Sequence, residues 1–416
     1  MQLRSIWRSS VATLEALKTE ATSEITHTRT LSTASPSGYL PTLDGWRAIA
    51  ILGVLACHGL EPVFCHNGFY PNDLWYRLTR HGAFGVDIFF GLSGFLICTR
   101  LLQELHRTGK INLARFYIRR GFRILPPYLT YLLAIAGLGY SGVLVVHRWE
   151  WLSCLLFFRN YIASRETGWY LGHFWSLAVE EHFYLIWPGV LLFFGPRRAR
   201  WAAALLALSV AGWRTLDFRE QWVSLAGGIG FYGRTDIRLD ALLWGCLAAL
   251  LLDRANWRES LADSVSRGSW LVLLIALLCC LAYQPPLAML WQAILVPMIV
   301  AGTVVRPASP VARLLEARPT RWIGRVSYSI YIWQQLFLVG SLQPRPLPLG
   351  ILQQYPVNII FVFAAASASY YVIERPFIKL GYVLSMRLVN RLPTVEAAAG
   401  LGVVTAKPQG EYAGSI

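Results

Sequence analysis

Long apolar runs alternate with short polar or basic links along most of the chain. About ten of these runs approach the roughly 20 apolar residues that a membrane-spanning helix needs. The pattern predicts an all-α protein, a polytopic helical membrane bundle of about ten transmembrane helices. The predicted spans are 42–60, 83–103, 124–146, 174–195, 201–215, 238–253, 269–284, 287–305, 326–343 and 355–373.

The pattern changes at both ends of the chain. Residues 1–38 are rich in Ser, Thr and Ala and lack the continuous apolar core of a signal peptide, so a flexible cytoplasmic tail is expected. Residues 39–380 form the predicted membrane domain, and residues 381–416 form a second cytoplasmic tail. Only 15% of the residues are charged, against about 25% in soluble proteins.

Basic residues concentrate in alternate links between the spans. The links around 104–123, 196–200 and 306–325 are rich in Arg, whereas the opposite links carry few cations. Basic links face the cytoplasm, so both termini are expected there, in the plasma (inner) membrane of the cell. This topology accounts for the net charge of +15, and no nucleic-acid partner is expected. The seven Cys are scattered, so neither a metal site nor a disulfide framework is predicted.

Two polar residues share one face of the first span. Arg47 and His58 are eleven residues apart, which is close to three helical turns and roughly 16 Å along the axis. Ionisable groups inside a membrane helix are costly and usually functional. The alternative is an arginine that reaches the membrane edge and a histidine packed in the core.

The second span places Asp87 on one face with Gly91 and Gly94. A carboxylate at membrane depth needs a partner, either an arginine or the imidazole of His58. A purely structural ion pair explains Asp87 equally well. The two glycines would let a neighbouring backbone approach closely.

Further polar residues recur at helical spacing in the fourth and ninth spans. His173, Ser176, Glu180 and Tyr184 share one face of the fourth span, and Tyr331 shares a face of the ninth with Gln334. Such stripes indicate a polar path inside the bundle.

Three arginines precede the third span. Arg120 and Arg123 lie on one face of the predicted helix, and Arg119 lies on another. Clustered guanidinium groups suit phosphate. Topology and contact with anionic lipid explain them as well, and spacing alone favours that explanation.

With these stretches in hand, the sequence resembles the acyltransferase-3 family of integral membrane acyltransferases, in its stand-alone form without an SGNH domain. The resemblance covers about residues 40–380. The matching stretches are LDGWRAIAILGVLACH, GVDIFFGLSGFLI, FYIRRGFRILPPY, FWSLAVEEHFYLIWP, GRVSYSIYIW and ERPF. Six such stretches in the family's order are highly specific.

The resemblance implies roles for particular residues. His58 corresponds to the family's essential histidine and Arg47 to its paired arginine, while Arg120 and Arg123 correspond to its Arg-x-x-Arg pair. The further candidates are Glu180 and Asp87 in the catalytic group, and Arg119 and Tyr331 in the donor-binding group. One position departs from the family: Gln334 stands where many members have histidine.

The implied activity is transfer of an acyl group from cytoplasmic acyl-CoA, most simply acetyl-CoA, to a hydroxyl of a cell-surface carbohydrate. His58 would act as general base, oriented by Glu180 or Asp87. A covalent route through Cys57 is disfavoured, because that side chain points about 100° away from His58. Acylation of a macrolide or other small metabolite is the nearest alternative, and a membrane transporter or flippase is the alternative from another class.

Overall fold

The computed structural model describes residues 39–66, 81–162, 168–220, 223, 233–266, 268–339 and 347–391. Every regular element in these residues is helical, which confirms the all-α prediction. The two predicted tails lie mostly outside these residues. The elements are α2 (Pro41–His66), η1 (His81–Phe84), α4 (Gly85–Thr108), α5 (Leu113–Tyr140), α6 (Arg148–Leu155), η2 (Arg159–Tyr161), α7 (Phe174–Glu220), α9 (Thr235–Leu252), α10 (Ala255–Ser266), α11 (Ser269–Tyr283), α12 (Ala288–Val305), α13 (Pro310–Leu315), α14 (Arg318–Phe337), η4 (Gly350–Gln353), α15 (Val357–Ser369), η5 (Tyr370–Glu374) and α16 (Arg375–Arg391).

Membrane-spanning character is concentrated in fewer helices than the sequence pattern suggested. Within the described residues five helical segments are long and apolar enough to cross a bilayer, or six if α10 and α11, bent by 79°, count as one span. The prediction of ten spans is therefore not confirmed. One reason is length, since α11 has only 15 residues. The five segments are Gly85–Thr108, Leu113–Tyr140, Phe174–Glu220, Ala288–Val305 and Val357–Arg387.

Breaks in the long helices follow glycine and proline. Gly195 has φ 66° inside α7, a left-handed conformation that glycine adopts without steric cost, and Pro196 follows it. The two arms of α7 correspond to the predicted spans 174–195 and 201–215. At the end of α15, the π turn η5 leads into α16, so the helix continues to Arg391 instead of ending near residue 373.

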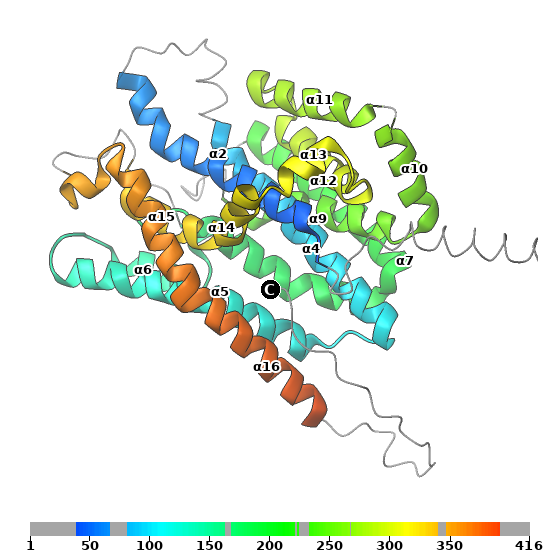
Figure 1. Ribbon diagram of the computed structural model, residues 1–416, viewed down its shortest axis with the longest axis horizontal. Helices are drawn as coiled ribbons and strands as arrows, with labels where there is room; N and C mark the ends of the chain where they lie inside the picture. The colour runs from blue at the N-terminus through cyan, green and yellow to red at the C-terminus, as the bar shows by residue number, and fades with distance from the viewer. Residues whose placement is uncertain are drawn as a thin grey trace, which may run out of the picture.

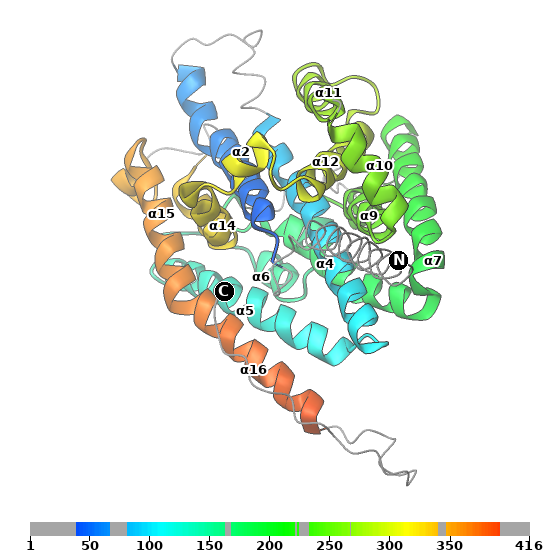
Figure 2. The ribbon, with the colours of Figure 1, turned by 45° about the vertical axis from the view of Figure 1, so that its right-hand side comes forward.

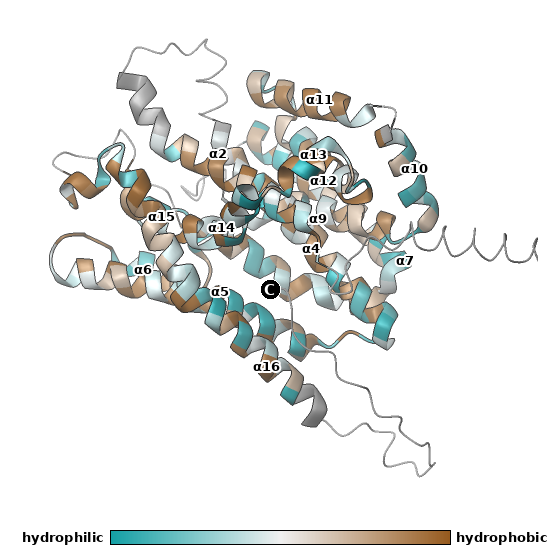
Figure 3. Cartoon of the chain, in the orientation of Figure 1, coloured by the Kyte–Doolittle hydropathy of each residue, from teal (hydrophilic) through white to brown (hydrophobic). Residues whose placement is uncertain are grey.

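The helices pack into one bundle around a continuous apolar core. Helix α2 packs against α4 and α14, and α9 packs between α4 and α7. Helix α16 runs beside α5, as Figures 1 and 2 both show. Figure 3 shows hydrophilic stretches on α5 and α16, whereas α11 is mostly hydrophobic. Helices α2, α5, α7 and α14 together carry most of the predicted functional residues.

Small residues bring α4 and α9 into close contact. A Cβ atom added at Gly94 would lie 1.9 Å from the carbonyl oxygen of Leu242, and one added at Gly245 would lie 2.3 Å from the carbonyl oxygen of Gly91. The thiol of Cys246 also donates a hydrogen bond to the carbonyl oxygen of Gly94, at 3.4 Å. The prediction that a glycine of this face admits a neighbouring backbone is confirmed for Gly94, whereas a Cβ at Gly91 would meet the side chain of Val296.

We expect Gly94→Ala to separate α4 from α9 and to destabilise the fold by about 1–3 kcal/mol, because the new methyl group would meet backbone atoms. The unfolding temperature of the purified protein, measured in detergent, should fall. Gly137→Ala in α5 is the matched control, because a Cβ there meets nothing within 4 Å. Equal unfolding temperatures for the two variants would show that the α4–α9 contact accommodates the added methyl group without loss of stability.

Candidate active site

His58 is held by a single side chain of α14. Its ring atom Nδ1 lies 2.8 Å from Oε1 of Gln334, which is fully buried. An amide oxygen only accepts hydrogen bonds, so Nδ1 carries the proton and donates it. The other ring nitrogen, Nε2, therefore keeps its lone pair and has the form that a general base requires.

Trp169, in the segment that precedes α7, packs against the His58 ring. The two rings meet edge to face, with centroids 5.3 Å apart. The indole Nε1 donates to the carbonyl oxygens of Gln335 and Leu338, at 3.0 and 2.9 Å. These carbonyl groups end α14 and lack intrahelical donors, so Trp169 both caps the helix and fixes the wall of the site. Buried Glu150 holds the preceding residue by accepting from the backbone N–H of Gly168, at 2.6 Å.

Neither of the carboxylates expected to orient His58 is hydrogen-bonded to it in the described residues. Glu180 accepts hydrogen bonds from Ser93 and Tyr184, each at 2.9 Å. Asp87 accepts from Arg238 at 2.7 Å. Both carboxylates are thus bonded to other groups, and the neutral amide of Gln334 holds the imidazole. Burial explains why an amide and not a carboxylate is bonded to His58, because a carboxylate there would add a charge to an apolar region.

Asp87 belongs to the interface between α4 and α9. The guanidinium group of Arg238 that binds it lies over the rings of Phe90 and Trp175, 5.8 and 5.5 Å from their centroids. Both charged side chains are largely buried, at 15% exposed for Asp87 and 8% for Arg238. The fold therefore gives Asp87 an arginine as its partner, one of the two partners expected for it.

Four arginines form a basic cluster, which we define as Arg47, Arg100, Arg120 and Arg123. Arg120 and Arg123 lie close enough to Arg47 and to Arg100 to interact with them electrostatically. Arg47 pairs with Asp44 at 3.1 Å. No carboxylate among the described residues lies within 4 Å of the other three guanidinium groups. Like charges brought together in this way favour an anionic ligand.

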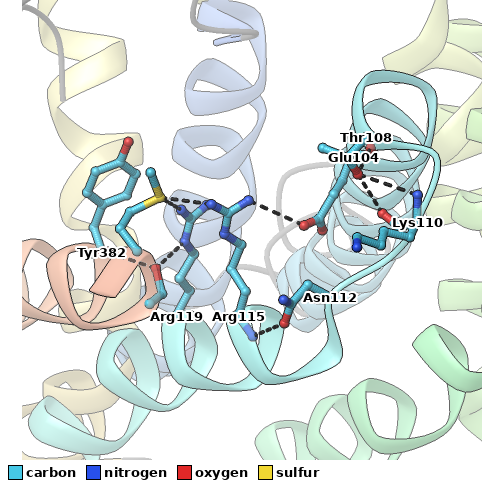
Figure 4. Close-up of polar contacts among 9 residues, drawn as sticks. Glu104, Thr108, Lys110, Asn112, Arg115, Arg119 and Tyr382 are labelled. Carbon is cyan, nitrogen blue, oxygen red and sulfur yellow. Dashed lines mark hydrogen bonds and ion pairs between the residues drawn. The ribbon is translucent and has the colours of Figure 1, made fainter. Parts of the chain in front are cut away.

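Arg119 lies at the edge of the basic cluster, within electrostatic reach of Arg100 but bonded to α16. Its guanidinium group donates to the hydroxyl of Ser385 at 2.9 Å and lies over the ring of Tyr382. Figure 4 shows Arg119 beside Arg115, both directed at α16. The structure therefore separates Arg119 from Arg120 and Arg123, as the helical spacing indicated, and gives it a contact with α16.

Polar side chains lie between the basic cluster and His58. We call them the polar stripe, and they are Glu180, Ser176, Tyr331 and His173. Glu180 interacts electrostatically with Arg47 and Arg120 at one end, and His173 interacts with His58 at the other. Tyr331 lies between them. Its hydroxyl bonds Ser176 Oγ at 2.6 Å and the carbonyl oxygen of His173 at 2.9 Å. Glu180 of α7 is thus coupled to Arg47 near the start of α2, and His173, before α7, is coupled to His58 further along α2.

Two of these interactions escaped the sequence analysis. Gln334 was placed on the face of Tyr331 and noted as a departure from the family's histidine, and Arg238 is the first residue of the predicted span 238–253, but neither was assigned a partner. The signal in both cases is a long polar side chain inside an apolar run. Its partner comes from a helix distant in sequence, so spacing within one helix could not reveal it.

Comparison of the sequence with known proteins identifies its family. The peptidoglycan O-acetyltransferase OatA of Listeria monocytogenes is 30% identical over 379 residues, which are 83% of this chain and 57% of that protein. The putative peptidoglycan O-acetyltransferase YrhL of Bacillus subtilis is 30% identical over 375 residues, 83% of this chain and 56% of its own length. The O-acetyltransferase OatA of Staphylococcus aureus is 27% identical over 375 residues, 83% of this chain and 58% of its own length.

The chain thus spans somewhat more than half the length of these curated relatives. No solved structure is significantly similar to it. The family model Acyl_transf_3, described as an acyltransferase domain, matches residues 40–375. This match covers all of the helices that form the site, and the chain belongs to the acyltransferase-3 family.

Proposed function

We propose that this protein is a membrane O-acyltransferase that moves an acyl group from cytoplasmic acyl-CoA to a hydroxyl of a cell-surface glycan. One observation carries the proposal: His58 is held through Nδ1 in the form of a base, at one end of a polar stripe whose other end is a basic cluster. The stripe offers one place for an anionic donor and another for proton transfer.

The donor end would be the basic cluster. Arg120 and Arg123 would bind the phosphates of acyl-CoA, and Arg47, paired with Asp44, would add positive charge beside them. Since Arg47 and His58 are roughly 16 Å apart along α2, the extended arm of the donor would carry the thioester toward His58. Acetyl is the simplest acyl group, because the three relatives are named O-acetyltransferases.

Nε2 of His58 would take the proton of the acceptor hydroxyl as its oxygen attacks the thioester carbonyl. The bond from the carbonyl carbon to sulfur then breaks, and the resulting imidazolium returns the proton to the departing thiolate. No further group is needed to accept or donate a proton. Gln334 would stabilise the imidazolium by accepting from Nδ1 throughout.

The topology expected from the basic links would put the two substrates on opposite sides of the membrane. The basic cluster would face the cytoplasm, where acyl-CoA is made, and both termini would lie on that side of the plasma membrane. His58 and Trp169 would face the outer side, where Trp169 offers an aromatic surface to a sugar. The names of two relatives specify peptidoglycan, which favours a glycan acceptor over a small metabolite.

The direct test is transfer of labelled acetyl from acetyl-CoA to a glycan by the purified protein in lipid vesicles. Mass spectrometry should find the glycan heavier by one acetyl unit. A glycan of unchanged mass, with acetyl-CoA and folded protein both present, would count against the proposed reaction.

Arg123→Gln should raise KM for acetyl-CoA by about 10- to 100-fold, the effect of losing a charge-assisted hydrogen bond. Arg119→Gln is the matched control, because it removes a charge from the same helix but from the face that contacts α16. Kinetics in detergent would compare the two variants at equal protein levels. Equal KM values for both variants would favour a role of the basic cluster in topology or lipid contact.

A further inference from the structure

We propose that His173 is a binding residue for the acyl donor, and that its Nε2 accepts a hydrogen bond from an amide N–H of the donor's pantetheine arm. This inference rests on the proposed function and deepens it. His173 precedes the first residue of α7, and neither the family match nor the relatives assign it a role.

The protonation of His173 is fixed by Gln335. The backbone N–H and ring Nδ1 of His173 both lie near Oε1 of Gln335, at 3.0 and 2.7 Å. The amide oxygen only accepts, so Nδ1 carries the ring proton. Consecutive glutamines of α14 therefore hold two histidines in the same form, Gln334 with His58 and Gln335 with His173.

The Nε2 atom of His173 is a buried acceptor that no described residue satisfies. The residue is 3% exposed, the backbone carbonyl of Ile332 also lies beside the imidazole, and Nε2 has no hydrogen-bond donor among the described residues. Rings of Tyr131, Phe174 and Tyr331 pack around the imidazole, with centroids 5.4, 4.4 and 5.5 Å away. Buried acceptors are almost always hydrogen-bonded in folded proteins. A donor supplied by a substrate would satisfy this one.

The place of His173 on the polar stripe points to the acyl donor. Glu180, seven residues further along α7, interacts electrostatically with Arg47, whereas His173 interacts electrostatically with His58. A molecule that extended from the basic cluster to His58 would therefore come within reach of His173 at the His58 end of the stripe. The pantetheine arm is uncharged and contains two secondary amides, whose N–H groups suit an imidazole acceptor among aromatic rings.

Two substitutions separate binding from structure. In His173→Asn the amide nitrogen can take the place of Nδ1 and keep the bond to Gln335, but the acceptor at Nε2 is lost. In His173→Gln the amide oxygen can take the place of Nε2, whereas the bond to Gln335 is lost. A binding role predicts that Asn is the harmful change, and a purely structural role predicts that Gln is.

The experiment measures binding of CoA, and of 3′-phospho-ADP as the nucleotide half alone, to the full chain in detergent. We expect His173→Asn to weaken CoA binding by about two- to tenfold, the usual effect of one neutral hydrogen bond. His173→Gln should bind CoA nearly as tightly as the unmodified protein. Binding of 3′-phospho-ADP should be unchanged in both variants.

Three results would overturn the assignment. CoA binding could be unchanged in His173→Asn while KM for the glycan rises, which would place the acceptor hydroxyl at His173. CoA binding could weaken only in His173→Gln, which would indicate a structural role. A parallel loss of 3′-phospho-ADP binding would place the effect outside the pantetheine arm. If the unmodified protein binds no CoA, the proposed function itself fails, and this result is distinct from the other three.

Discussion

His58→Asn should lower the rate of acyl transfer by about 10²- to 10⁴-fold, the usual contribution of a positioned general base. The substitution is chosen because the asparagine amide can replace the Nδ1–H donor and keep the bond to Gln334. Only the basic nitrogen Nε2 disappears. The effect should fall on kcat, since the basic cluster that would bind the donor is untouched. Steady-state kinetics of labelled acetyl transfer would measure it.

His182→Asn provides the matched control. His182 is also half-buried and also bonded through Nδ1, to the hydroxyl of Thr235 at 2.7 Å, but it faces away from the polar stripe. We expect this variant to transfer acetyl at the unmodified rate. If His58→Asn kept its activity with normal CoA binding, the base would have to be another group. If both variants lost activity together, general damage to the bundle would explain the result.

The sequence was most informative where a pattern lies within one helix. The shared face of Arg47 and His58, the stripe from His173 to Tyr184 and the separation of Arg119 from Arg120 all follow from helical periodicity, and the structure reproduces their geometry. The close approach permitted by Gly94 follows from residue size in the same way. These features need no knowledge of which helices are neighbours.

Contacts between helices were beyond that reasoning. The partner of His58 lies 276 residues further along the chain, and the partner of Asp87 lies 151 residues further. Charge alone suggested that a carboxylate would orient His58. The fold instead pairs Asp87 with an arginine of α9 and supplies an amide to the imidazole. Hydropathy also predicted ten spans where five or six helical segments of the described residues are long and apolar enough to cross a bilayer, because runs of suitable composition include helices as short as α11.

The second large effect concerns the buried pair of Asp87 and Arg238. Removal of one partner leaves an uncompensated charge, and we expect Asp87→Leu or Arg238→Met alone to destabilise the protein by about 3–5 kcal/mol. Replacement of both partners by apolar residues removes both charges. Such replacements are often neutral, so the double variant should recover most of the lost stability. The unfolding temperatures of the unmodified protein, the two single variants and the double variant, measured in detergent, would give the coupling between the two residues.

The same four proteins also test whether Asp87 joins α4 to α9 or takes part in the reaction. If its role is to join α4 to α9, the double variant should regain acetyl transfer together with stability, because Met can still pack against Phe90 and Trp175 where Arg238 now lies. A double variant that folds with the unmodified unfolding temperature but transfers no acetyl would make Asp87 or Arg238 part of the chemistry. We expect activity to follow stability, because both charges of the pair are already engaged with each other at 2.7 Å.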